Sequence, residues 1–199
     1  MARPLNIGVA VLAAGASRRF GDTDKLAARF LGAPLAEHVI RALPMEVFDS
    51  GWIVTPPRSA FAPANLRDKG FDILENPQAE TGMGSSVALS AAAALDRGLD
   101  GLVIALADMP LVPTEHYRRL AQALMDEPDI WLSGDGAKLS PPAGFGAQHL
   151  QELAKLKGDK GARDLLLSGQ KLLCPAAWLA DVDTPDDIVR LETQVRSQS

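Results

Sequence analysis

The chain has 199 residues, of which 47% are hydrophobic and 23% charged, and its formal net charge is −5. This length suits one α/β core better than two, so we expect a single domain over residues 1–199. The negative charge argues against a protein that binds nucleic acid by neutralising phosphates. One cysteine, Cys174, excludes an internal disulfide and a cysteine-rich zinc site.

The hydropathy pattern excludes a membrane-spanning helix, because no apolar stretch approaches the ~20 residues that a bilayer requires. A short apolar run extends over residues 7–14, and Arg18 and Arg19 follow it at once. This arrangement is unlike a secretory signal. We therefore expect a soluble cytoplasmic protein without a membrane partner, in which this run forms a strand.

Apolar runs typical of buried strands alternate along the chain with segments of helical period. We predict strands at residues 7–12, 52–55, 71–74, 102–106, 130–132, 172–174 and 178–182, and helices at 34–43, 85–95, 114–125, 148–156, 161–167 and from 185 onward. Thr114 and Thr184 are the predicted N-caps of two helices. The alternation predicts a three-layer α/β/α Rossmann-like fold with a mainly parallel sheet, in which ligands bind at the carboxyl ends of the strands.

The loop after the first predicted strand is rich in small residues, since residues 12–26 read LAAGASRRFGDTDKL. Small residues let the backbone approach a ligand closely and turn N–H groups toward an anion. Arg19 and Lys25 add cationic donors that suit a phosphate chain. The spacing matches neither a P-loop nor Gly-x-Gly-x-x-Gly. The same loop also fits an ordinary strand-to-helix turn with solvated arginines.

Acidic residues follow two other predicted strands. Asp108 comes directly after the strand at 102–106 and could hold Mg²⁺, or could cap the following turn. Asp181 and Asp183 alternate on the predicted strand at 178–182 and beyond, which would place them on one face. One of them could share the metal with Asp108. Capping of the last helix is the alternative, and it accounts well for Asp186 and Asp187.

Two further segments are candidate binding loops. Asn76, Gly82 and Ser85 precede or open an alanine-rich helix, whose N-terminus could bind an anion or a polar base edge, or could simply be capped by serine. Residues 158–163, GDKGAR, could order a substrate phosphate or form a surface turn with a weak ion pair. The three histidines show no nucleophilic triad.

Taken together, these segments resemble the MobA-like nucleotidyltransferases, and among them the molybdenum cofactor cytidylyltransferase branch. The matching motifs are Leu12-Ala13-Ala14-Gly15 with Ser17, Arg19, Gly21 and Lys25, then Asn76, Gly82-Met83, residues 106–110, residues 158–163 and Asp183-Thr184-Pro185. The resemblance implies a nucleotidyltransferase fold that uses Mg²⁺ and a nucleoside triphosphate. The family transfers a nucleotidyl group to a phosphate monoester and releases pyrophosphate.

The resemblance also implies roles for individual residues. It implies Arg19, Lys25 and Asp108 as catalytic residues, Leu12, Ala13, Ala14, Gly15, Ser17, Lys25, Asn76, Gly82 and Ser85 as nucleotide-binding residues, Asp108 and Asp183 as metal ligands, and Gly158, Asp159 and Arg163 as acceptor-binding residues. The guanylyl branch has glycine where this chain has Ala14. The added methyl group favours a pyrimidine, so we expect CTP as the substrate, by a preference of about 1–3 kcal/mol.

The acceptor implied by the resemblance is molybdopterin, with a molybdoenzyme as receiver of the product. The cytidylyl branch has a Gly-His-Pro stretch where this chain has Ser140-Pro141, and we interpret Pro141-Pro142 as a rigid loop. This departure leaves the acceptor open. One alternative is a related enzyme that uses GTP or another triphosphate with a different phospho-acceptor. Another is a non-catalytic module that binds and delivers a nucleotide-containing cofactor.

Overall fold

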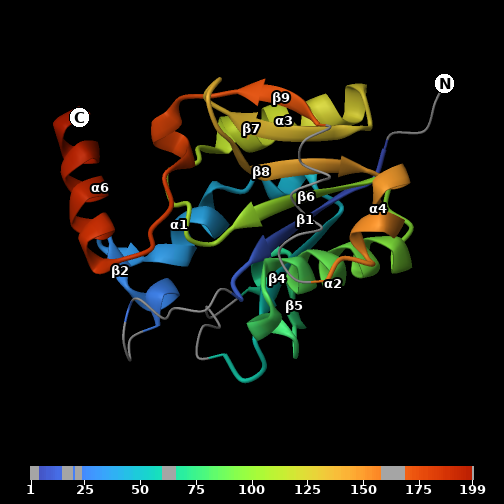
Figure 1. Ribbon diagram of the computed structural model, residues 1–199, viewed down its shortest axis with the longest axis horizontal. Helices are drawn as coiled ribbons and strands as arrows, with labels where there is room; N and C mark the ends of the chain where they lie inside the picture. Colours follow the sequence, from blue (N-terminus) through green and yellow to red (C-terminus); the bar gives the residue numbers. More distant parts are fainter. Residues whose placement is uncertain (1–4, 15–19, 21–23, 60–65, 158–168, 199) are drawn as a thin grey trace.

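The structure is a computed structural model that describes residues 5–14, 20, 24–59, 66–157 and 169–198 (Figure 1). One sheet has seven strands in the order β5-β4-β1-β6-β8-β7-β9. Their bounds are β1 Ile7–Leu12, β4 Ser50–Thr55, β5 Phe71–Glu75, β6 Gly101–Leu106, β7 Ile130–Gly134, β8 Leu139–Gly146 and β9 Gln170–Leu173. The helices are α1 Leu35–Ala42, α2 Met83–Asp96, α3 Thr114–Asp126, α4 Ala147–Leu153 and α6 Pro185–Gln198. A small hairpin pairs β2 Arg29–Phe30 with β3 Ala33–Pro34.

The sheet is mainly parallel, as predicted. Strands β5, β4, β1 and β6 are parallel neighbours, and β7 and β9 also pair in parallel. Strand β8 runs antiparallel to both β6 and β7. The carboxyl ends of the central strands β1 and β6 therefore lie at the same edge of the sheet.

Helices cover both faces of the sheet, because the central strands are apolar on both sides. All six residues of β1 are buried. Ile7, Val9 and Val11 belong to the core beneath α1 and α3, whereas Ala10 and Leu12 pack with α2 and α4 on the opposite face. Figure 1 shows α2 and α4 side by side below the sheet. This arrangement confirms the predicted three-layer α/β/α fold.

The last helix is anchored near the carboxyl ends of β1 and β6. Phe20, Phe30, Leu35, Val182 and Leu191 form a separate small core that joins α6 to the β2–β3 hairpin (Figure 1). The backbone before α6 also reaches the sheet, since the Val182 N–H donates to the Asp108 carbonyl oxygen at 2.9 Å. The segment that precedes α6 is thereby fixed beside the end of β6.

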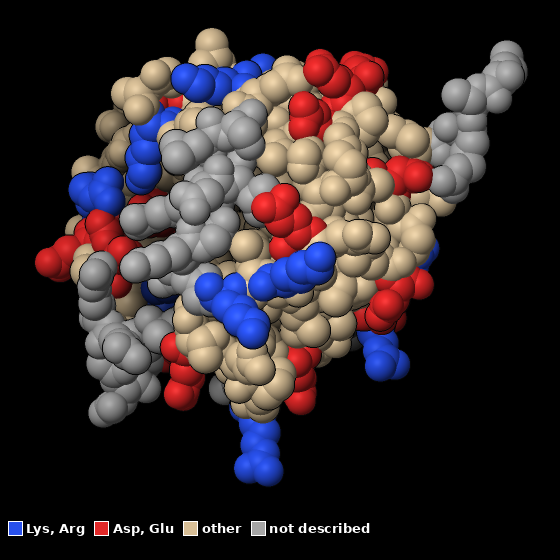
Figure 2. Space-filling view, turned by 45° about the vertical axis from the view of Figure 1, so that its right-hand side comes forward, with Lys and Arg blue, Asp and Glu red and all other residues tan. Residues whose placement is uncertain are grey.

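Two further observations concern the surface charge and the length of the helices. On the face shown in Figure 2, acidic and basic side chains are interspersed, and the coloured residues form no basic stripe of the kind that follows a nucleic-acid backbone. Of the helices in the described ranges, none combines the length and apolar character needed to cross a lipid bilayer.

Three local predictions are wrong. Residues 178–182 form no strand; the 3₁₀ helix Ala176–Leu179 follows Pro175, and residues 180–184 are irregular, so Asp181 and Asp183 do not share the face of a strand. Pro113 is the N-cap of α3, and Thr114 is already helical.

Pro141-Pro142 lies inside β8 rather than in a loop. It is placed at the shift in register where Leu132 pairs with Ala143 but Ser133 pairs with Ser140. Prolines are tolerated there because a bulge needs fewer backbone donors. The predicted helix at 161–167 lies outside the described residues.

A buried polar chain joins α3 to β7 and β8. The Ser133 Oγ donates its proton to the Pro142 carbonyl oxygen at 2.6 Å, so the His116 Nε2, 2.7 Å from that Oγ, is the donor in their bond. The His116 Nδ1 has no hydrogen-bond partner among the described residues. Burial, reinforced by the charge of Arg119, lowers the pKa of His116 to about 4. The imidazole is therefore neutral in the folded protein at neutral pH.

This buried imidazole predicts a loss of stability in mild acid. The unfolded His116 takes up a proton below about pH 6.5, whereas the folded side chain stays neutral down to about pH 4. The free energy of unfolding should therefore fall as the pH decreases through this window, by on the order of 3 kcal/mol at its lower end. Urea titrations of the wild type and of His116→Gln, which does not titrate, measure the effect. The unfolding free energy of the variant should depend less on pH than that of the wild type. Parallel pH profiles would contradict the low pKa of His116.

Candidate active site

A cavity of about 430 Å³ opens at the carboxyl ends of β1 and β6. Its volume falls in the range of small-molecule binding sites. Its walls come from the end of β1, the 3₁₀ helix Lys25–Ala27 (η2), the 3₁₀ helix Ala79–Thr81 (η5) with the start of α2, and the end of β6. The lining residues are Leu12, Ala13, Ala14, Lys25, Leu26, Ala79, Glu80, Thr81, Gly82, Met83, Ser86, Leu106 and Asp108.

Strand register brings the first loop to Asp108. Leu12 pairs with Leu106 at the ends of β1 and β6, and the Ala107 N–H donates to the Leu12 carbonyl oxygen at 3.1 Å. On the other side of β1, the Ala13 N–H donates to the Val54 carbonyl oxygen at 2.8 Å. The two post-strand segments that the sequence singled out therefore meet at one cavity, as expected at the carboxyl ends of parallel strands.

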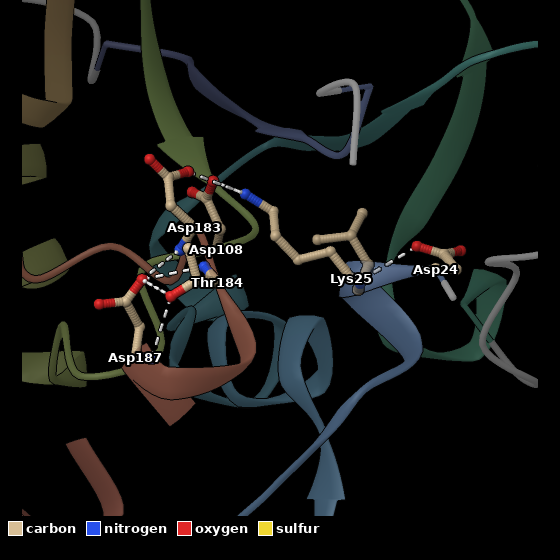
Figure 3. Close-up of polar contacts among 7 residues, drawn as sticks. Asp24, Lys25, Asp108, Asp183, Thr184 and Asp187 are labelled. Atoms are coloured by element: carbon tan, nitrogen blue, oxygen red, sulfur yellow. Dashed lines mark hydrogen bonds and ion pairs between the residues drawn. The ribbon is translucent and has the colours of Figure 1, made fainter. Parts of the chain in front are cut away.

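Lys25 lies between two carboxylates at this cavity. Its Nζ is 2.7 Å from the Asp108 Oδ2 and 3.5 Å from the Asp183 Oδ1 (Figure 3). Lys25 is only 7% exposed. The η2 turn fixes its position, because the Asp24 carboxylate accepts the Leu26 N–H at 3.0 Å and so caps the turn. One buried ammonium group thus forms ion pairs with two acids from distant parts of the chain.

The Asp108–Asp183 pair suits a divalent cation. Carboxylate oxygens are the ligands that Mg²⁺ prefers, and Mg²⁺ commonly takes only one or two of them, with waters and substrate phosphates as its other ligands. The convergence of both acids on one ammonium group shows that a cation fits at this place. In the described ranges, no group of three or more His, Cys, Asp or Glu side chains is arranged to hold a metal ion.

Asn76 and Ser85 form the scaffold of one cavity wall. The Asn76 Nδ2 is 2.9 Å from both the Ser85 Oγ and the Ser86 Oγ, and its Oδ1 accepts the Gln78 N–H at 2.9 Å. The Ser85 Oγ also lies 2.9 Å from the Gly82 carbonyl oxygen. These bonds hold η5 against the start of α2. Gly82 makes the connection with a φ of 118°, which side chains rarely permit, and it lines the cavity itself.

Several lining residues were not predicted from the sequence. Glu80 and Thr81 line the cavity from η5, and Met83 and Ser86 line it from the start of α2. Met83 belongs to a motif that carried the family resemblance, but no periodicity marks the single turn of η5. Leu26, the neighbour of Lys25, also lines the cavity.

Six of the predicted site residues lie outside the described part of the chain. They are Gly15, Ser17, Arg19, Gly158, Asp159 and Arg163. Their roles stay predictions.

The comparison with family models identifies the family of the chain. The model described as the MobA-like NTP transferase domain matches residues 9–172. The chain belongs to this family. It is thus a nucleotidyltransferase, and all the residues that line the cavity lie within the matched range.

Relatives of this MobA-like nucleotidyltransferase extend over nearly its whole length. The purine catabolism protein PucB of Bacillus subtilis is 34% identical and covers 96% of this chain and 98% of its own. The crystal structure of Rv0371c from Mycobacterium tuberculosis has a TM-score of 0.75 at 26% identity and covers 94% of this chain and 98% of its own. Rv0371c is also known as a complex with manganese. A nucleotidyl transferase from Methanothermobacter shares the fold, with a TM-score of 0.77 at 18% identity over 98% of this chain and 99% of its own.

Proposed function

We propose that this MobA-like nucleotidyltransferase transfers CMP from CTP to a phosphate monoester in the presence of Mg²⁺. The acceptor that we propose is molybdenum-bound molybdopterin, which would give the cytosine dinucleotide cofactor and pyrophosphate. The observation that carries the proposal is the place of Lys25. A buried ammonium group at the mouth of the cavity faces two carboxylates, so groups for a phosphate chain and for its metal lie together.

The triphosphate is the part of the substrate that the first crossover loop suits best. Leu12, Ala13 and Ala14 line the cavity next to Lys25, at the start of the crossover loop. Main-chain N–H groups and an ammonium group together complement a polyanion. We propose that Lys25, with Arg19 from the same loop, neutralises the phosphates, and that Gly15 and Ser17 complete the cradle.

Asp108 and Asp183 are the proposed metal ligands. Both supply carboxylate oxygens, and the place between them accepts a cation, as the position of Lys25 indicates. When bound, the divalent cation supplies positive charge where negative charge develops on the phosphates. The manganese complex of Rv0371c supports a divalent cation in this fold. We propose Mg²⁺ for this chain.

The transfer itself requires positioning rather than a protein nucleophile. An oxygen of the acceptor phosphate attacks the α-phosphorus of CTP, and the bond from that phosphorus to the bridging oxygen of the β-phosphate breaks. Pyrophosphate leaves with the bond electrons. A phosphate monoester is already an anion near neutral pH, so no general base is needed. The protein contributes alignment and positive charge, as in other phosphoryl-type transfers.

Ala14 supports a pyrimidine base. Ala14 lines the cavity and is only 9% exposed. A methyl group in the wall removes room that a purine ring would use, and a contact of this size discriminates by about 1–3 kcal/mol. CTP is therefore the proposed triphosphate.

The acceptor is proposed from the motif at residues 158–163. Gly158, Asp159 and Arg163 would contact the acceptor phosphate, and a molybdoenzyme would receive the product. Ser140 and Pro141 replace the His-Pro of the cytidylyl branch, and they lie in β8 beside the buried His116–Ser133 pair. A different phospho-acceptor is the alternative that this replacement favours.

Pyrophosphate release tests the function most simply. The purified protein with Mg²⁺ is given CTP, GTP or ATP together with molybdopterin, a sugar phosphate or another small phosphate monoester. We expect release with CTP and molybdopterin, at a rate at least about 10-fold above that with GTP. Turnover with GTP but not with CTP would contradict the proposed preference for cytosine. Turnover with another phosphate monoester but not with molybdopterin would contradict the proposed acceptor. Binding of CTP without turnover of any acceptor would support a delivery module instead.

A further inference from the structure

The N-terminus of α6 is held by a reciprocal cap between Thr184 and Asp187. The Asp187 Oδ2 accepts hydrogen bonds from the Asp183 N–H at 3.1 Å, the Thr184 N–H at 2.9 Å and the Thr184 Oγ1 at 2.8 Å. In return, the Thr184 Oγ1 accepts the Asp187 N–H at 3.3 Å. This is a capping box, and it confirms Thr184 as the predicted N-cap.

Asp187 does not face the cavity. Its other oxygen, Oδ1, accepts from the Arg190 Nη2 at 2.6 Å. That bond, with those from Thr184 and from the backbone of Asp183, holds the pKa of the Asp187 carboxyl well below its usual range. Both oxygens therefore have partners within α6 and its cap. Figure 3 shows Asp187 on the other side of the Asp183–Thr184 backbone from Lys25 and Asp108.

Two hydrogen bonds of the neighbouring backbone hold Asp183 in position. It lies in the irregular stretch before α6, and its side chain is 48% exposed, so close packing does not fix it. On one side, the Val182 N–H bonds to the carbonyl oxygen of Asp108. On the other, the Asp183 N–H bonds to Asp187. The first bond joins the backbone before Asp183 to the backbone of Asp108, and the second joins the backbone of Asp183 to the Asp187 carboxylate.

We propose that Asp187 is a positioning residue for the divalent cation, because it holds Asp183 near Asp108, on either side of the place that the Lys25 ammonium group occupies. This inference rests on the proposed function, in which Asp183 is a metal ligand. It assigns the start of α6 a task besides helix stability. Residues of this kind, which orient a ligand without touching the metal, typically change metal affinity by about 10–100-fold when they are removed.

The test measures binding of Mn²⁺ to the protein with CTP and no acceptor, by electron paramagnetic resonance of free Mn²⁺. Asp187→Ala removes every hydrogen bond that the Asp187 carboxylate accepts. The dissociation constant of Mn²⁺ should therefore rise about 10-fold in this variant. Asp187→Asn keeps an oxygen for the cap and should stay near the wild type. Arg190→Ala is the matched control, because it removes only the bond to the Asp187 Oδ1 and leaves the cap intact. It should also bind Mn²⁺ like the wild type.

Stability measurements separate positioning from a merely structural role. If Asp187→Ala and Arg190→Ala lose unfolding free energy but both bind Mn²⁺ with wild-type affinity, the proposal is overturned. The same holds if all three variants weaken Mn²⁺ binding in proportion to their loss of stability. If Asp187→Ala does not fold, Asp187→Ser takes its place, since it offers one short hydroxyl where the cap uses a carboxylate, and the same loss is expected.

Asp183→Asn distinguishes failure of the inference from failure of the proposed function. We expect this variant to weaken Mn²⁺ binding at least as much as Asp187→Ala. Weakened binding in Asp183→Asn with unchanged binding in Asp187→Ala would overturn the positioning role alone. Unchanged binding in Asp183→Asn would overturn the ligand role of Asp183 and the inference with it.

Discussion

Asp108→Ala is expected to reduce Mg²⁺-dependent pyrophosphate release by about 1,000-fold or more. In the proposed mechanism Asp108 is the metal ligand at the end of β6 that also contacts Lys25, at 2.7 Å. Its removal would take away several kcal/mol of charge stabilisation in the transfer step. The measurement is the initial rate of pyrophosphate release at saturating CTP over a range of Mg²⁺ concentrations.

The control for this variant is another carboxylate that forms an ion pair far from the cavity. Asp72 on β5 pairs with Arg97 at 2.6 Å and does not line the cavity. Asp72→Ala should keep the wild-type rate. Circular dichroism should show that Asp108→Ala is folded, because the β1–β6 pairing does not depend on its side chain. Wild-type turnover by folded Asp108→Ala would eliminate the metal assignment.

Lys25→Ala should weaken CTP binding by about 10–100-fold, since a charge-assisted hydrogen bond contributes about 1.5–3 kcal/mol. The proposed partners of Lys25 are the outer phosphates, so binding of CMP should change much less than binding of CTP. Isothermal titration with both nucleotides measures the contrast. Lys69→Ala, at an exposed lysine outside the cavity, is the matched control. Equal losses for CTP and CMP would show that Lys25 does not contact the triphosphate tail.

The same variant should have the opposite effect on the metal alone. Without nucleotide, the Lys25 ammonium competes with a divalent cation for Asp108 and Asp183. Its removal leaves two carboxylates facing each other without a counter-charge, so Lys25→Ala should bind Mn²⁺ more tightly than the wild type in the absence of CTP. Weaker binding of free Mn²⁺ would mean that the ion and the lysine occupy different places.

Much of the fold follows from local sequence. The β-branched run at residues 7–12 predicts a strand buried on both faces, and β1 is such a strand. Strand β8 could not be predicted in the same way, because Pro141-Pro142 reads as a loop. Its prolines are accommodated by the shift in register against β7, and that shift is a property of the pairing rather than of either segment. The prediction of a strand at 178–182 was wrong because a 3₁₀ helix begins directly after Pro175.

The candidate site was predictable where it depends on strand ends. Lys25 and Asp108 meet because parallel strands deliver their following loops to one edge of the sheet. The position of Asp183 has another cause. The Val182–Asp108 backbone bond and the cap of α6 hold it near Lys25, and alternation on a strand plays no part. The wall formed by η5 was not predictable, because a single 3₁₀ turn leaves no repeat in the sequence.

The most direct measurement is a crystal structure of the protein with CTP and Mn²⁺, in which anomalous scattering locates the metal. We expect a triphosphate along residues 12–25, with Mn²⁺ bound by the Asp108 carboxylate and Lys25 moved from its place between Asp108 and Asp183. A nucleotide bound elsewhere, or a metal peak away from Asp108, would contradict it.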